Sequence, residues 1–171
     1  MTKSTTESSL FKIDTFGYNL KMNKKIAIII ERANINLGGA ERSMFELRSA
    51  LTAQNCSVDI IAAKGKTNNK RIKILCQNIP GKRVSYPVFA KFTKQYLEQN
   101  KYDIIHSVLP FDFADIYQPR GGCLAESIER NASSYQNRII ENYKKITTYT
   151  NFRRTQLLKA EQKLCKPNNK T

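Results

Sequence analysis

Short apolar runs rich in β-branched residues recur along this chain and predict buried strands. The first run, Ile26–Ile30, is too short to span a membrane and is typical of a strand buried on both faces of a parallel sheet. The later runs predict further strands at Val58–Ala63, Arg71–Leu75, Tyr102–Ser107 and Ala114–Gln118.

Helical patterns separate these strands. One apolar stripe after the first strand joins Ala40, Met44, Leu47 and Leu51. Pro87 can occupy the first turn of a second helix that runs to about Asn100. We expect this helix to bury Val88, Phe92 and either Tyr96 or Leu97, and we expect further helices near Leu124–Arg130 and over about Tyr135–Leu164.

Strands that alternate with helices predict an α/β fold, namely a Rossmann-like open parallel sheet with helices on both faces. We assign this domain to residues 25–164. Residues 1–24 are Ser/Thr-rich at their start and have no clear period, so we expect a poorly ordered N-terminal tail. Residues 165–171 form a polar C-terminal tail.

The loop after the first strand carries Gly38 and Gly39 and leads directly into a helix. Strand, glycine pair and helix start are the parts of an anion-binding turn, because glycines let the backbone approach a ligand and the first helical N–H groups point at it. The alternative is that the two glycines only turn the chain between strand and helix.

The formal net charge of +15 is unevenly distributed. No acidic residue lies between Asp59 and Glu98, and only Glu161 opposes the basic stretch from Lys144 to Lys170. Such stretches favour a negatively charged partner, which would be nucleic acid, an anionic membrane surface or a phosphorylated substrate. A solvated face that keeps the protein in solution explains them equally well.

The four cysteines lie far apart and the chain has a single histidine, His106, so the common zinc spacings are excluded and we predict no metal site. Free thiols are typical of a reducing compartment. The chain also lacks a long apolar segment and the apolar core of a signal peptide. These features predict a cytoplasmic location.

Three motifs, in this order, resemble the N-terminal half of family-4 glycosyltransferases of the GT-B fold, in a layout similar to the glucosyltransferases of lipopolysaccharide core assembly. They are KIAIIIER followed by GGAERSMFELRSAL, then YDIIHS, and then DIYQPRGGCLAESIER. The resemblance covers about Lys25–Leu164. It implies transfer of a sugar from a nucleotide-diphosphate sugar to an acceptor, with retention of configuration and with no metal or other cofactor.

The resemblance also implies roles for particular residues. Gly38 and Gly39 would donate backbone N–H groups to the donor diphosphate, and His106 would act as the catalytic residue near the transferred sugar. The alternative for His106 is a core or capping histidine. Acceptor or cleft positions would be Glu41, Arg42, Arg120, Gly121, Gly122 and Glu126, although a surface role suits Arg120 and Glu126 as well.

The family's second, donor-binding domain has no counterpart in this sequence, and polar residues 165–171 stand where relatives continue into another buried strand. We therefore expect a truncated or split enzyme that is inactive without a separate donor-binding chain, with a sheet that lacks its last strand. Its partners would be the nucleotide-sugar donor, a lipopolysaccharide, glycolipid or other glycan acceptor, and the anionic cytoplasmic face of the inner membrane.

The competing interpretation is a basic protein that binds nucleic acid or a membrane surface without catalysis. Nucleic acid is the less favoured partner, because no recognised nucleic-acid-binding motif is present and aromatic residues are not interleaved with the basic runs.

Overall fold

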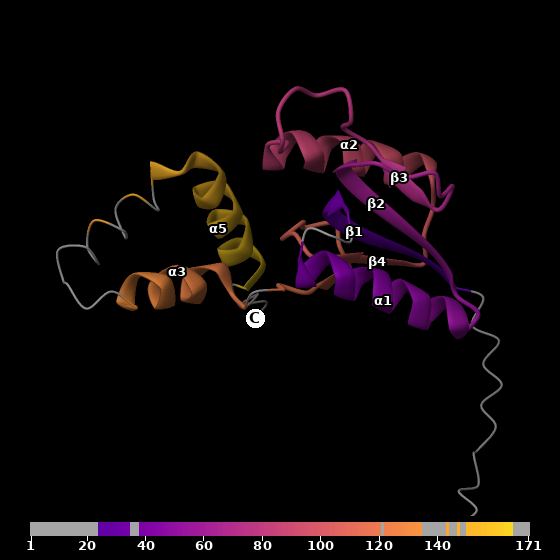
Figure 1. Cartoon of the computed structure of the whole chain (residues 1–171), viewed down its shortest axis with the longest axis horizontal. Coiled ribbons are helices and arrows are strands. Elements are labelled where there is room, and N and C mark those ends of the chain that lie inside the picture. The colour runs from indigo at the N-terminus through magenta and orange to yellow at the C-terminus, as the bar shows by residue number, and fades with distance from the viewer. Residues whose placement is uncertain are drawn as a thin grey trace, which may run out of the picture.

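A five-stranded parallel sheet in the order β3-β2-β1-β4-β5 forms the centre of the protein (Figure 1). The computed structural model describes residues 24–34, 38–120, 122–134, 143, 147 and 150–165. The strands are β1 (Lys25–Ala33), β2 (Ser57–Gly65), β3 (Ile72–Ile74), β4 (Ile104–Ser107) and β5 (Ile116–Tyr117). The predicted Rossmann-like α/β fold is thus confirmed, and each predicted strand is found.

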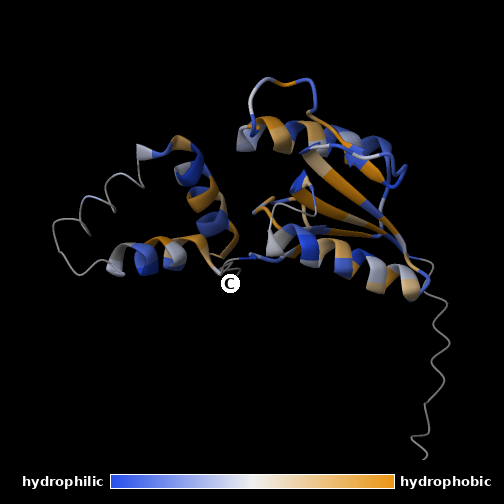
Figure 2. Cartoon of the chain, in the orientation of Figure 1, coloured by the Kyte–Doolittle hydropathy of each residue, from blue (hydrophilic) through white to orange (hydrophobic). Residues whose placement is uncertain are grey.

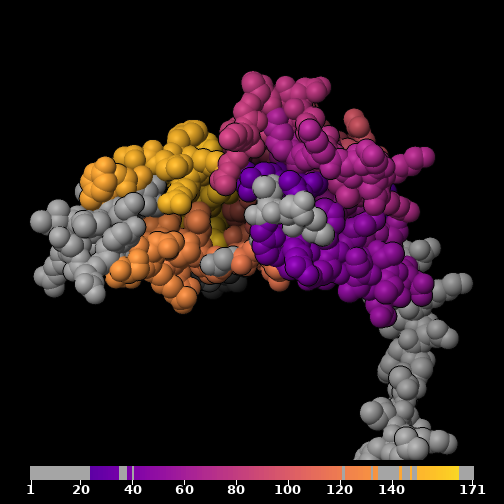
Figure 3. Space-filling view, viewed as in Figure 1, coloured from indigo at the N-terminus to yellow at the C-terminus, as the bar shows by residue number. Residues whose placement is uncertain are grey.

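The helices cover both faces of this sheet, as predicted. Helix α1 (Gly39–Ala53) lies on one face and α2 (Tyr86–Gln99) on the other, while α3 (Leu124–Ser133) and α5 (Phe152–Cys165) follow β5 and lie to one side of the sheet (Figure 1). In the space-filling view, the orange and yellow atoms of α3 and α5 lie directly beside the part of the chain that contains the sheet (Figure 3). Apart from Lys24 and Cys165, the two predicted tails lie outside the described residues.

Apolar side chains of β1 alternate between two cores, one on each face of the sheet. Ile26, Ile28 and Ile30 pack on the α1 side with Met44, whereas Ala27 and Ile29 pack on the α2 side with Phe89 and Phe111. The hydropathy view shows the strands as an apolar layer between the helices (Figure 2). Strand β1 is therefore buried on both faces, as its unbroken apolar run predicts.

The predicted inward face of α2 is wrong for Val88 and Phe92, whereas the predicted burial of Tyr96 or Leu97 is confirmed. Val88 is 36% exposed and Phe92 41% exposed, whereas Phe89 is 2% exposed and Thr93 fully buried. Phe89 and Thr93 are one turn apart and therefore share a helix face with Tyr96 and Leu97, which pack on the same core. Two adjacent apolar stripes at helical spacing are present in this helix, and only its contact with the sheet decides between them.

The single helix predicted over Tyr135–Leu164 is also wrong, because the chain is not helical at Asn151. The Asn151 side chain accepts a hydrogen bond from the backbone N–H of Arg154 at 3.2 Å, and its carbonyl accepts one from Thr155 at 3.0 Å. This is the pattern of a helix N-cap, for which asparagine is strongly preferred. Helix α5 therefore starts afresh at Phe152.

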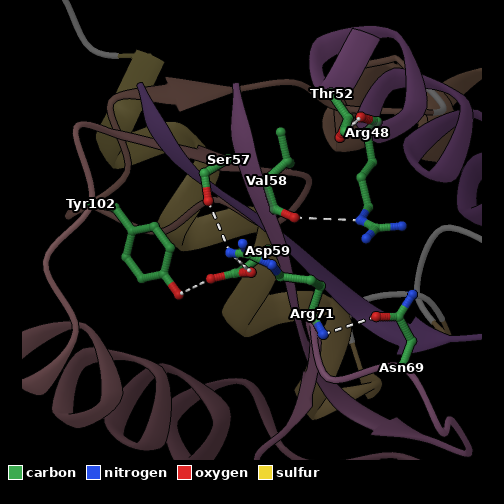
Figure 4. A network of polar contacts seen from close by, with 8 residues as sticks. All are labelled: Arg48, Thr52, Ser57, Val58, Asp59, Asn69, Arg71 and Tyr102. Carbon is green, nitrogen blue, oxygen red and sulfur yellow. Dashed lines mark hydrogen bonds and ion pairs between the residues drawn. The ribbon is translucent and has the colours of Figure 1, made fainter. Parts of the chain in front are cut away.

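A buried carboxylate ties strands and loops together near the amino ends of the strands. Asp59 is 5% exposed and accepts hydrogen bonds from the Tyr102 hydroxyl at 3.0 Å and from Arg71 Nη1 at 3.2 Å (Figure 4). Arg71 Nη1 also donates to Ser57 Oγ at 2.8 Å. These bonds connect β2 to the segments that lead into β3 and β4.

A second buried carboxylate joins α3 and α5 to the sheet. Glu161 of α5 is 4% exposed and accepts hydrogen bonds from the Tyr117 hydroxyl at 2.7 Å and from the backbone N–H of Leu124 at 2.6 Å. Because Leu124 is the first residue of α3, the carboxylate caps a helix end whose dipole favours a negative charge. One side chain therefore contacts β5, α3 and α5.

The α2 assignment predicts unequal effects for two phenylalanines on one helix. We expect Phe89→Ala to lower the free energy of unfolding by about 3–5 kcal/mol, because it opens a cavity in the α2-side core. Phe92→Ala, the matched control, should lower it by about 0.5 kcal/mol. Urea denaturation followed by circular dichroism measures both, and equal losses would contradict the assigned helix face.

The Glu161 contacts predict that Glu161→Gln lowers the free energy of unfolding by about 1–3 kcal/mol, because the two donors approach different carboxylate oxygens and glutamine replaces one of these oxygens with an NH2 donor. Glu129 is exposed on α3 and provides the control substitution Glu129→Gln, which should change stability by about 0.5 kcal/mol or less. Urea denaturation of the two variants tests this, and a Glu161→Gln variant as stable as the control would show that the cap contributes nothing.

Candidate functional site

The carboxyl ends of β1, β4 and β5 meet at one edge of the sheet. Strand β1 lies between β2 and β4, so the chain leaves β1 toward one side of the sheet and later returns to its other side. In open α/β sheets, ligands bind at such a switch point, outside the carboxyl ends of the strands. The predicted site residues follow these strand ends.

Gly38 and Gly39 lie where α1 begins. Gly38 is extended, with φ 160° and ψ 178°, and its carbonyl accepts the hydrogen bond of Arg42 N–H at 3.2 Å. A Cβ atom at Gly38 would come no closer than 3.5 Å to Glu41, and one at Gly39 would meet nothing within 4 Å. Neither glycine is therefore required by backbone strain or by packing among the described residues.

His106 lies on β4 beside the central strand. It pairs with Ile28 of β1 and with Ile116 of β5. Because directly paired residues project to the same face of a sheet, the ring lies on the α1 side, where Ile28 packs. His106 is 8% exposed, and its Nε2 atom is buried without a hydrogen-bond partner among the described residues.

The surroundings of His106 favour the neutral ring. Burial lowers the pKa of His106 below its ordinary value of 6.5, and the positive charge of Arg120 lowers it further, while a hydrogen bond with the Gln118 side chain acts in the opposite direction. The imidazole is consequently uncharged at neutral pH. The charge of Arg120, which follows β5, thus acts on the His106 ring of the neighbouring strand.

Of the remaining predicted residues, Glu41 pairs with a residue of β1, whereas Arg42 and Glu126 pair along their own helices. Glu41 forms an ion pair with Arg32 at 3.8 Å, whereas Arg42 pairs along α1 with Glu46 at 3.0 Å and is 72% exposed. Glu126 is exposed and pairs with Arg130 one turn along α3.

Two glycines complete the predicted set. Gly122 has φ 78°, a left-handed conformation that favours glycine whatever its role at the site. Gly121 lies outside the described residues. The roles proposed for all of these residues stay predictions.

Charged groups that were not predicted lie at the same edge. Glu31 at the end of β1 forms ion pairs with Arg153 of α5 at 2.7 Å and with Arg83, just before α2, at 3.9 Å. The sequence signal was the pair Glu31-Arg32 directly after the apolar run, because charged residues at a strand end lie at the sheet edge. Their partners come from distant segments and could not be read from spacing.

Two further properties concern cofactors and membranes. Within the described ranges, no group of three or more His, Cys, Asp or Glu side chains is placed to hold a metal ion. The described helices include none with the length and apolar character that crossing a bilayer requires.

The lowered pKa of His106 predicts how stability depends on pH. Well above pH 6.5 the ring is neutral in both the folded and the unfolded chain, so its contribution is constant. As pH falls below that value the unfolded chain takes up the proton first, and stability decreases. We expect NMR titration to give His106 a pKa below 6.5 that rises in Arg120→Gln, while Arg42→Gln, the control, leaves it unchanged.

Comparison with known proteins agrees with this architecture. Residues 37–120 match the model of the family described as Glycosyltransferase Family 4. A search of curated proteins finds no match. Among solved structures, the chain is similar to WaaG, a glycosyltransferase involved in lipopolysaccharide biosynthesis, with a TM-score of 0.50 and 14% identity. That likeness covers 81% of this chain but only 41% of WaaG, so the chain spans less than half the length of that protein. The resemblance to family-4 glycosyltransferases predicted from the sequence is therefore confirmed, through a matching segment and a shared fold.

Proposed function

We propose that this chain is the acceptor-side domain of a glycosyltransferase that moves a sugar, with retention of configuration, from a nucleotide-diphosphate sugar to a glycan or glycolipid acceptor. One observation carries the proposal. The start of α1 at Gly38-Gly39 and the buried His106 lie at the carboxyl edge of the sheet on the α1 face, and both belong to the segment that matches Glycosyltransferase Family 4.

The glycine pair would stabilise the leaving diphosphate. When the bond between sugar and diphosphate breaks, negative charge develops on the phosphate oxygens, and preorganised N–H donors lower the energy of that state. The first N–H groups of α1 are such donors, and the helix dipole adds positive potential there. The space around Gly38 and Gly39 leaves room for a close approach of the phosphate groups.

His106 would position the transferred sugar. A neutral imidazole can donate or accept a hydrogen bond, and the unpartnered Nε2 atom has this capacity unused. Leaving such a buried atom unsatisfied costs about 1–3 kcal/mol, which a sugar hydroxyl would recover. Burial lowers the pKa of His106 and so favours the uncharged ring, Arg120 adds to this effect, and its guanidinium would contribute positive charge to the site.

A separate donor-binding domain, on another chain or another segment, would complete the cleft. The support is that this chain spans 41% of the solved glycosyltransferase that it resembles. We expect the chain alone to show no sugar transfer from nucleotide sugars to a glycolipid acceptor. We also propose an anionic membrane surface as the place of the acceptor, since the net charge of +15 would attract the chain to it.

Substitutions at Gly39 test the diphosphate contact, because Gly39 is the first residue of α1. Gly39→Pro removes one N–H donor at a helix position where proline is well tolerated, and Gly39→Ala keeps the N–H but adds a Cβ that the protein can accommodate. We expect both variants to melt at or above the wild-type temperature and to weaken the binding of UDP-glucose, measured by NMR titration. Proline should weaken it about tenfold, because a charge-assisted hydrogen bond is lost.

Ala53→Ser at the other end of α1 provides a control that leaves the N-terminus of the helix intact. Wild-type binding should shift the amide signals of Gly38 and Gly39 and the ring signals of His106. If both Gly39 variants bind UDP-glucose with the wild-type affinity, the assigned diphosphate contact is wrong. Robust sugar transfer by this chain alone would overturn the proposed dependence on a second domain.

A further inference from the structure

A pocket of about 820 Å³ opens at the carboxyl ends of β1 and β2, apart from His106. Its walls come from the ends of these strands, from α1, from β3 and from the segment before α2. Its volume falls in the range of small-molecule sites. The lining residues are Arg32, Ala33, Asn34, Phe45, Lys64, Gly65, Lys66, Thr67, Ile72, Gln77, Gly81 and Lys82.

The charge of this pocket is positive. Its lining includes the side chains of Arg32, Lys64, Lys66 and Lys82 and no carboxylate. The charge of Arg32 is partly compensated by Glu41 at 3.8 Å, whereas the Lys64 ammonium group donates to the backbone carbonyls of Gln77 and Ile79, which carry no net charge. A concave surface lined by one sign of charge raises the local concentration of oppositely charged ligands.

The pocket is built from closely packed parts. Gly65 ends β2 so near to β1 that a Cβ atom there would lie 2.9 Å from both Ala33 Cβ and the Ala33 carbonyl oxygen. Lys64 Nζ donates to the carbonyl of Gln77 at 3.0 Å and to that of Ile79, and the Gly65 N–H donates to Gln77 Oε1 at 3.3 Å. These bonds hold the segment around Gln77 against the end of β2.

Polar and apolar groups surround the cations. Thr67 and Gln77 contribute a hydroxyl and an amide to the lining, and Phe45 and Ile72 contribute apolar surface. A sugar ring presents hydroxyl groups at its rim and C–H groups on its faces, so it matches such a mixture better than a bare anion does.

We propose that this pocket binds a phosphorylated sugar, with the phosphate held by Lys66, Lys82 and Arg32. The pocket lies at the same edge as the start of α1, to which the Arg32–Glu41 ion pair connects it. Assigning the phosphorylated sugar to the acceptor rests on the proposed function, and the phosphate of the acceptor would then lie beside the sugar-transfer site rather than in it.

Isothermal titration calorimetry of the full chain with glucose 6-phosphate tests the binding, with glucose as the uncharged comparison. The double variant Lys66→Gln/Lys82→Gln removes two exposed cations of the pocket. We expect about a tenfold loss of affinity for glucose 6-phosphate in this variant, because charge-assisted hydrogen bonds to the phosphate are lost.

The double variant Lys94→Gln/Lys101→Gln is the matched control. It removes the same charge from exposed positions in the second half of α2 and just before β4, near the opposite edge of the sheet. We expect it to change the affinity less than about twofold. Equal losses in the two double variants would overturn the proposal, because net charge alone would then explain the binding. Equal affinities for glucose and glucose 6-phosphate would also overturn it.

Competition with UDP-glucose separates this proposal from the proposed function. Glucose 6-phosphate that stays bound at saturating UDP-glucose supports a separate pocket, and its displacement would place the phosphate in the donor site and overturn the proposal. A chain that binds glucose 6-phosphate through Lys66 and Lys82 but does not bind UDP-glucose would refute the donor contact and leave the pocket assignment standing.

Discussion

Burial of β1 on both faces is the constraint on which the rest of the structure depends. Ile28 packs on the α1 side and Ile29 on the α2 side, and both are completely buried. A strand with two apolar faces must lie inside a parallel sheet with helices above and below. Its carboxyl end therefore delivers Glu31, Arg32 and the loop before α1 to the middle of the ligand-binding edge.

In this strongly basic chain, buried carboxylates connect distant segments. Asp59 holds Tyr102 and Arg71 near the amino edge, and Glu161 joins β5, α3 and α5. Glu31, which is partly exposed, pairs with Arg153 of α5 at the carboxyl edge. A buried carboxylate is costly unless it is paired, so the contacts of Asp59 and Glu161 restrict how their segments can be arranged. Because the chain has 14 acidic side chains and 29 Lys and Arg side chains, each buried acidic group marks a particular contact between segments.

Packing or backbone conformation requires glycine at some positions of the fold and not at others. Gly65 is required by the close approach of Ala33, and Gly122 by its left-handed backbone. Neither reason applies to Gly38 or Gly39, which are extended or helical and surrounded by space. The same contrast holds for His106, a buried ring whose Nε2 atom has no partner among the described residues. The described residues thus give these three predicted site positions no structural role, and their ligand contacts stay predictions.

The sequence by itself determined the sheet, the order of strands and helices and the family resemblance, because unbroken apolar runs and glycine-containing turns act locally. Only the tertiary structure decided which stripe of α2 is buried, since Phe89 and Phe92 are equally apolar and differ only in what they face. The start of α5 at Phe152 depends instead on a local contact, the N-cap of Asn151, which the helical pattern around it did not indicate. The spacing of residues in the sequence also could not predict the basic pocket or the pairing of Glu31 with Arg153. The residues of both come from separate segments that meet only at the carboxyl edge of the folded sheet.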